Sequence, residues 1–202
     1  IFLINLFLFI TDQSISLSSN KLEFIIENNY NPTVPPITHL RTKNKILPLS
    51  GLSNVKTVTA NENGYWGIFD SDEYGFNNIK GQHRKILNTN NKRLIFLGDS
   101  MTQGSAVNQN ENFVSLINEN SDFTTLNLAY GGNGLLLSLA TYKEYGNHIK
   151  NSNVIFCFYE GNDFFEYEVE EKNNEILKKY LNKNYSQNLI NSNYEKDNLV
   201  KK

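Results

Sequence analysis

The sequence is poor in the residues that build disulfide and metal scaffolds. Its 202 residues include one Cys, three His and four Pro. A single Cys excludes a disulfide framework within the chain and any Cys-based zinc site. The net charge of −2 provides no basic field for nucleic acid, and polyanion binding is therefore a poor expectation.

The composition favours a folded centre with polar ends. The hydrophobic fraction is 39% and the charged fraction 20%, which lies on the globular side of the boundary with disorder. We expect three segments. Residues 1–29 are a membrane-anchor or signal remnant with a short helix, residues 30–91 are a linker and β-rich extension, and residues 92–202 are an α/β unit with a polar C-terminal segment.

Residues 1–10 form an apolar run interrupted only by Asn5. Ten residues are too few for a transmembrane helix, which needs about 20. The run has two interpretations: the tail of a membrane span or signal core cut upstream, or a buried element of the soluble fold. Because the chain starts with Ile1 and not Met, we favour truncation, and a membrane-anchored or exported protein over a cytoplasmic one. Membrane attachment through the N-terminus is a hypothesis.

Residues 18–69 are predicted to form a short helix, a linker and β-like pieces. Leu22, Ile25 and Ile26 have helical spacing, which predicts an amphipathic helix over residues 18–29. Three prolines follow between residues 32 and 36 and predict an extended linker that is poor at helix. Short β-like pieces then cover residues 55–60 and 65–69.

Three apolar runs each end in a polar, loop-forming cluster. Residues 94–97 are uninterrupted apolar residues, typical of a parallel strand buried on both faces, and residues 123–128 and 154–159 are also strand-like. Helical spacing over residues 113–117 and 135–149 would return the chain across the sheet. The sequence therefore predicts an α/β fold with a parallel sheet.

The clusters after these strands contain the candidate site. Ser100 follows the first strand, Gly132 the second and Asn162 the third, and parallel strands place these ends at one edge of the sheet. A hydroxyl, a glycine amide and a carboxamide that converge there are the parts of a nucleophile and an oxyanion hole. Each cluster taken alone is also an ordinary turn.

These residues resemble the SGNH (GDSL-type) serine hydrolases. The resemblance rests on Gly98-Asp99-Ser100, on residues 127–132 (NLAYGG) and on Gly161-Asn162-Asp163, and it covers about a third of the chain. It implies a three-layer α/β fold with a flavodoxin-like parallel sheet. It also implies an enzyme that acts on esters or O-acyl groups with no metal and no cofactor. It also implies that Ser100 is the nucleophile. The amides of Ser100 and Gly132 and the side chain of Asn162 would then stabilise the oxyanion.

The sequence departs from this family in two places. Glu160 stands where the third motif usually begins with Gly, which puts the local turn in doubt. The family's Asp-x-x-His motif is absent, because none of His39, His83 and His148 has that pattern and none follows Asn162. A serine without its histidine keeps only the binding and oxyanion machinery. We therefore expect a partial SGNH domain, incomplete at its C-terminus, with little or no turnover and an exposed sheet edge prone to aggregation.

The expected function is that of a serine esterase or acyl-ester hydrolase on a small-molecule or glycan ester. Two alternatives stay open: an O-acetyltransferase or deacetylase on a glycan with the same serine, and a non-catalytic binding module that kept the pocket. We expect Cys157 to be a buried strand residue, Asp163 a turn-forming carboxylate and His148 a solvated residue at a helix end. From Asn182 onward, polar residues dominate and have nothing obvious to pack on.

Overall fold

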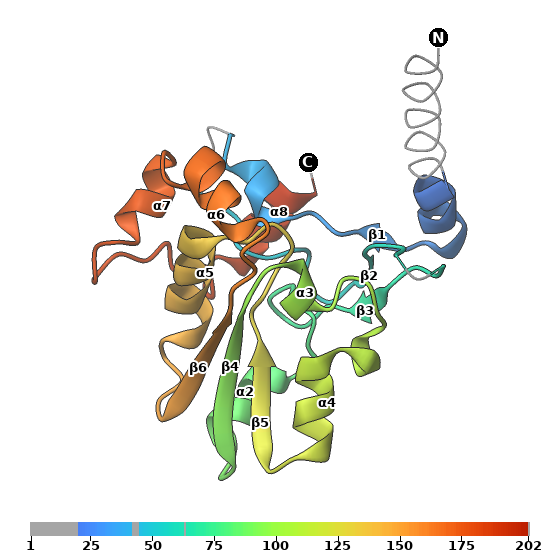
Figure 1. Cartoon of the computed structure of the whole chain (residues 1–202), viewed down its shortest axis with the longest axis horizontal. Coiled ribbons are helices and arrows are strands. Elements are labelled where there is room, and N and C mark those ends of the chain that lie inside the picture. The colour runs from blue at the N-terminus through green and yellow to red at the C-terminus, as the bar shows by residue number, and fades with distance from the viewer. Residues whose placement is uncertain (1–19, 42–44, 63, 202) are drawn as a thin grey trace.

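The computed structural model describes residues 20–41, 45–62 and 64–201. This part of the chain forms an α/β structure with two three-stranded sheets (Figure 1). The apolar run over residues 1–10 lies outside the described residues. Within them, no helix is both long enough and apolar enough to span a membrane.

The main sheet has the strand order β5-β4-β6, with β4 (Lys92–Gly98) between β5 (Phe123–Asn127) and β6 (Ser152–Cys157). Both pairings are parallel, and Ile95 stands opposite Leu126 on one side and Val154 on the other. The three predicted strands and their parallel direction are therefore confirmed. All three strands end at the same edge of the sheet (Figure 1).

The two faces of this sheet are covered by different helices. On one face Ile95 and Leu97 belong to a core that includes residues of α2 (Gln82–Asn88) and α5 (Leu135–Thr141). On the other face Leu94 and Phe96 pack against Val114 of α4 (Phe113–Asn120). Because β4 is buried on both sides, its apolar residues run without the alternation of a half-exposed strand.

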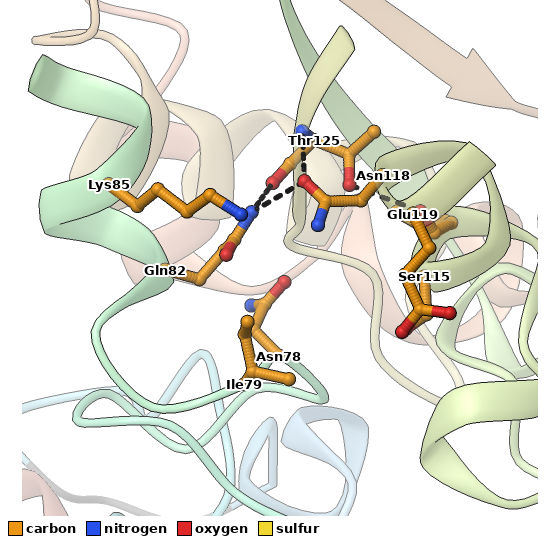
Figure 2. A pocket seen from close by; sticks show the side chains of 9 residues that line it. Asn78, Ile79, Gln82, Lys85, Ser115, Asn118, Glu119 and Thr125 are labelled. Carbon is orange, nitrogen blue, oxygen red and sulfur yellow. Dashed lines mark hydrogen bonds between the residues drawn. The ribbon is translucent and has the colours of Figure 1, made fainter. Parts of the chain in front are cut away.

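The outer edge of β5 is closed by side-chain amides. Asn78 donates to the Asn127 carbonyl and accepts from the Asn127 amide, both at 2.8 Å. Gln82 donates to the Thr125 carbonyl at 2.6 Å, and Asn118 accepts from the Thr125 amide at 3.1 Å (Figure 2). These carboxamides occupy the places of a neighbouring strand's peptide groups, so β5 offers no free edge for further pairing.

The outer edge of β6 is different. Val154 is 42% exposed, and Ile155 and Phe156, which point to opposite faces, are each 37% exposed. Cys157, predicted to be buried, is half-buried and packs against the α4 side of the core. Because β6 has a neighbouring strand on one side only, its apolar side chains stay accessible, as expected for an open sheet edge.

A small second sheet precedes the main one. It has the order β1-β2-β3, from β1 (Asn31–Pro32), β2 (Lys56–Val58) and β3 (Ile68–Asp70). The proline-rich linker was expected to be extended, but residues 36–39 form the 3-10 helix η1 (Pro36–His39). Pro36 starts this helix, a position where the missing amide has no partner to lose. Residues 20–28 are helical, as predicted, with Leu22 and Ile26 exposed.

Several short helices complete the chain. Their bounds are α3 (Ser100–Gln103), η2 (Gln109–Glu111), the π-helical turn η3 (Tyr142–Gly146) that continues α5, α6 (Asp163–Glu166), the π-helical turn η4 (Tyr167–Glu171), α7 (Glu175–Lys179) and α8 (Asn193–Val200).

The polar C-terminal segment is packed, and the expectation that it has nothing to pack on is wrong. Glu144 on η3 accepts hydrogen bonds from the Tyr180 hydroxyl at 2.6 Å and from the Leu189 amide at 2.9 Å. Lys196 on α8 is fully buried and donates to the Gly51 carbonyl at 2.5 Å. The charged side chains of Glu144 and Lys196, which the sequence alone would place at the surface, therefore fix the C-terminal segment through hydrogen bonds to residues far along the chain.

Candidate active site

The turn after β4 presents Ser100 at the carboxyl edge of the sheet. Gly98 has φ +148°, and a Cβ there would lie 2.7 Å from the Cys157 carbonyl oxygen, so only glycine fits. Asp99 caps α3 by accepting a hydrogen bond from the Met101 amide at 2.9 Å. Ser100 is the first residue of that helix and is half-buried. The strand-to-helix turn expected around this serine is therefore present.

The glycine loop after β5 passes beside Ser100. A Cβ on Gly131 would lie 3.7 Å from the Ser100 Cβ, and the Gly131 amide donates to the Gln103 side chain at 2.9 Å. Gly132 has φ +75°, and a Cβ there would lie 2.7 Å from Ile37 of η1. Both the backbone angle and the close approach of Ile37 require glycine at this position.

Two amides near the serine are available to an anion. The Met101 amide is taken by Asp99, and the Gly131 amide is taken by Gln103. Across the part of the chain that the structure describes, the amides of Ser100 and Gly132 have no hydrogen-bond partner. Free amides at a glycine loop and a helix start are the donors that an oxyanion hole uses.

Asn162 comes from the third strand end and starts α6. Its side-chain nitrogen donates to Glu166 at 3.1 Å, and its side-chain oxygen is buried without a partner among the described residues. Next to it, Asp163 is fully buried and accepts a hydrogen bond from the Tyr159 amide at 2.9 Å, as befits a turn-forming carboxylate. A Cβ on Gly134 would lie 3.1 Å from the Asp163 carbonyl oxygen. The glycine loop thus contacts Ser100 at one end and the start of α6 at the other.

A hollow of about 250 Å³ opens beside Ser100. Its walls come from Glu62 and from the segment that follows the serine, namely Met101, Gly104, Ser105, Ala106 and Val107. Gly132 and Asn162 are not among its lining residues. The hollow of about 230 Å³ in Figure 2 is a separate one, because it lies between α2 and α4 at the outer edge of β5.

Two acidic residues at this edge were not anticipated. Glu171 on η4 accepts hydrogen bonds from the amides of Gly134 at 2.8 Å and Leu136 at 2.6 Å, and so caps α5 from a distant segment. Burial raises the pKa of Glu171 to about 7 in spite of these amides, and the charge of Asp163 adds to the shift. The only sequence signal for Glu166 is its spacing, four residues after Asn162 on a helix.

The three histidines occupy different environments. His83 is buried in the core, with its Nε2 atom 3.3 Å from the Asp72 carboxylate. His148 is exposed after η3, as expected. His39 is half-buried on η1, the element whose Ile37 contacts Gly132. Within the described ranges, no group of three or more His, Cys, Asp or Glu side chains is arranged to hold a metal ion.

Comparison with known proteins adds no relative. No family model matches the sequence, and searches of curated proteins and of solved structures found no match either.

Proposed function

We propose that this chain is part of an SGNH-type serine hydrolase that acts on ester bonds. The strand order supports the proposal. If β4 is taken as the first strand of a flavodoxin-like sheet, β5 and β6 take the places of the second and third, which gives the order 2-1-3. In such sheets the ligand binds at the switch point between the first and third strands. Ser100 follows the first of these strands and Asn162 follows the third.

The observation that carries the proposal is that the amides of Ser100 and Gly132 are both unpartnered among the described residues, in a glycine loop whose Gly131 approaches the Ser100 side chain. Ser100 Oγ attacks the ester carbonyl carbon and forms the new C–O bond. The carbonyl oxygen becomes an anion, which the two amides and the Asn162 side chain stabilise. The bond to the leaving alcohol then breaks, and a base takes the serine proton and returns it to that alcohol. Water releases the acyl group in the second half of the cycle.

The proposal assigns the base to a group outside these 202 residues. His83 is engaged with Asp72 in the core, His148 is exposed after η3, and none of the three histidines, His39 included, has the Asp-x-x-His pattern. Imidazole in solution supplies the missing function in a test, because its ring is the group that a catalytic histidine provides. The oxyanion donors and the nucleophile can then be examined with the chain as it is.

The test is acylation of Ser100 by p-nitrophenyl acetate in the presence of imidazole, mapped by peptide mass spectrometry. We expect an acetyl group on Ser100 and its loss in Ser100→Ala. Ser105→Ala is the matched control, because Ser105 lines the same hollow, and it should leave the modification in place. Acetylation that avoids Ser100 would refute the proposal. An ester that binds near Ser100 without acylating it would favour the binding module instead.

A further inference from the structure

Asn162 and Glu166 form one hydrogen bond where their groups have room for two. Asn162 Nδ2 donates to Glu166 Oε1 at 3.1 Å. The remaining oxygens of the same two groups, Asn162 Oδ1 and Glu166 Oε2, are both buried without a partner in the described chain. Both are acceptors when Glu166 is ionised, so neither can satisfy the other. A buried, unpartnered acceptor costs about 1–3 kcal/mol and calls for a donor.

A single proton resolves this arrangement. A carboxylic acid and a carboxamide pair through two parallel hydrogen bonds, one from the amide N–H to the acid C=O and one from the acid O–H to the amide C=O. The first of these bonds is the one observed. A proton on Glu166 Oε2 would supply the second, and both orphaned oxygens would then be satisfied.

We infer that Glu166 is a positioning residue for Asn162. The Glu166 carboxyl carries a proton on Oε2 and through it donates a hydrogen bond to Asn162 Oδ1. With two hydrogen bonds the carboxamide is fixed in rotation, and one Nδ2 proton stays free to point at an oxyanion. This role rests on the proposed function, since it matters for catalysis only if Asn162 is an oxyanion donor. The pairing itself does not depend on catalysis.

The surroundings of Glu166 favour its protonated form. Burial raises its pKa to about 7, and the negative charges of Asp163 on its own helix, Glu171 on η4 and Asp99 after β4 add to the shift, against the hydrogen bond from Asn162. The lysine of the following turn, Lys172, is engaged by Glu168. Above about pH 7, Glu166 ionises and loses the hydrogen bond from its Oε2 to Asn162 Oδ1. These two oxygens then repel each other. The carboxamide is then free to turn.

The experiment is a pH titration of the side-chain NH₂ signals of Asn162 by ¹H–¹⁵N NMR on the whole chain, with the signals assigned by their loss in Asn162→Ala. We expect both protons to shift with a midpoint near pH 7. Glu166→Gln should abolish the titration and hold the signals near their acidic positions, because a glutamine forms both hydrogen bonds at every pH. Glu195→Gln, at an exposed site on α8, should leave the titration unchanged.

Asn162 signals that do not move between pH 5.5 and 8.5 would overturn the inference, as would a titration that persists in Glu166→Gln. If that variant does not fold, the pH titration of the Glu166 carboxyl ¹³C signal in the wild-type chain is measured instead. The inference requires a titration midpoint near pH 7, and a midpoint near pH 4.5 contradicts it. Since neither readout needs turnover, an unreactive Ser100 would refute the proposed function and leave this pairing standing.

Discussion

The side chain of Gln103 accepts a hydrogen bond from the amide of Gly131 at 2.9 Å, which joins the helix of the serine to the glycine loop of the next strand. Gln103 is 1% exposed and lies three residues after Ser100 on α3. The bond removes the Gly131 amide from the set of free donors. It leaves the neighbouring Gly132 amide as the one that the loop offers to an anion.

Replacing this glutamine should loosen the loop. Gln103→Leu keeps most of the side-chain volume but leaves the Gly131 amide without an acceptor, so we expect the free energy of unfolding to fall by about 1–3 kcal/mol. Gln109→Leu is the matched control, because its amide bonds the Asp70 carbonyl near the surface, and it should cost at most about 1 kcal/mol. Urea denaturation measures both. Equal losses in the two variants would contradict a special role for the bond to Gly131.

The amide cap on β5 makes a second prediction. Asn78→Ala removes the partner of both the amide and the carbonyl of Asn127, and we expect a loss of about 3 kcal/mol. Asn88→Ala removes a hydrogen bond within an exposed helix turn and should change stability by less than about 0.5 kcal/mol. Thermal or urea unfolding compares them. A small effect of Asn78→Ala would mean that water replaces the carboxamide at the strand edge.

Glu171 predicts how stability depends on pH. Its pKa is about 7 in the folded chain against 4.5 as the ordinary value, so between these pH values the folded state holds the proton more tightly. Its contribution is full below about pH 4.5 and is lost as the pH rises through 7. Because 2.5 pKa units correspond to at most about 3 kcal/mol, the difference in unfolding free energy between wild type and Glu171→Gln should shrink by up to that amount across this window.

Urea unfolding at several pH values measures this difference. Glu195→Gln, at an exposed site on α8, should give a difference that is flat with pH. A wild-type advantage over Glu171→Gln that grows between pH 4.5 and 7 would contradict the raised pKa.

The open edge of β6 predicts self-association. Ile155 is exposed on a strand with one free side, so Ile155→Lys should place a charge on that edge and reduce oligomer formation. Leu22→Lys is the control, since Leu22 is also exposed but lies on the helix of residues 20–28. Sedimentation velocity measures both. Association that falls equally in both variants would point to a general effect of charge and not to the strand edge.

Local pattern was enough to predict the three parallel strands and the turns that follow them. An uninterrupted apolar run such as residues 94–97 indicates a strand that is buried on both faces. Gly98 and Gly132 both have positive φ angles, which other residues rarely adopt. The partners of Gln103, Glu144 and Lys196 could not be predicted. Each bonds a group at least 28 residues away, and nothing near it in the sequence marks it as buried.

The same limit applies to the strand edges and to Asn162. The amides that cap β5 come from segments before and after β4, so no short window contains them together. The link between Asn162 and Glu166 is local, at four residues, but only the structure shows that their remaining oxygens are buried. In this chain, the burial of polar side chains is therefore the feature that could not be predicted from the sequence.

The most direct test of the account is the rate at which p-nitrophenyl acetate acylates Ser100 in Asn162→Ala, with imidazole as the base. If Asn162 stabilises the oxyanion, its loss should slow acylation on the order of 10²–10³-fold, while Asn153→Ala, an exposed asparagine on β6, should leave the rate unchanged. An Asn162→Ala chain that is acylated at the wild-type rate would contradict the shared role of Ser100, Gly132 and Asn162.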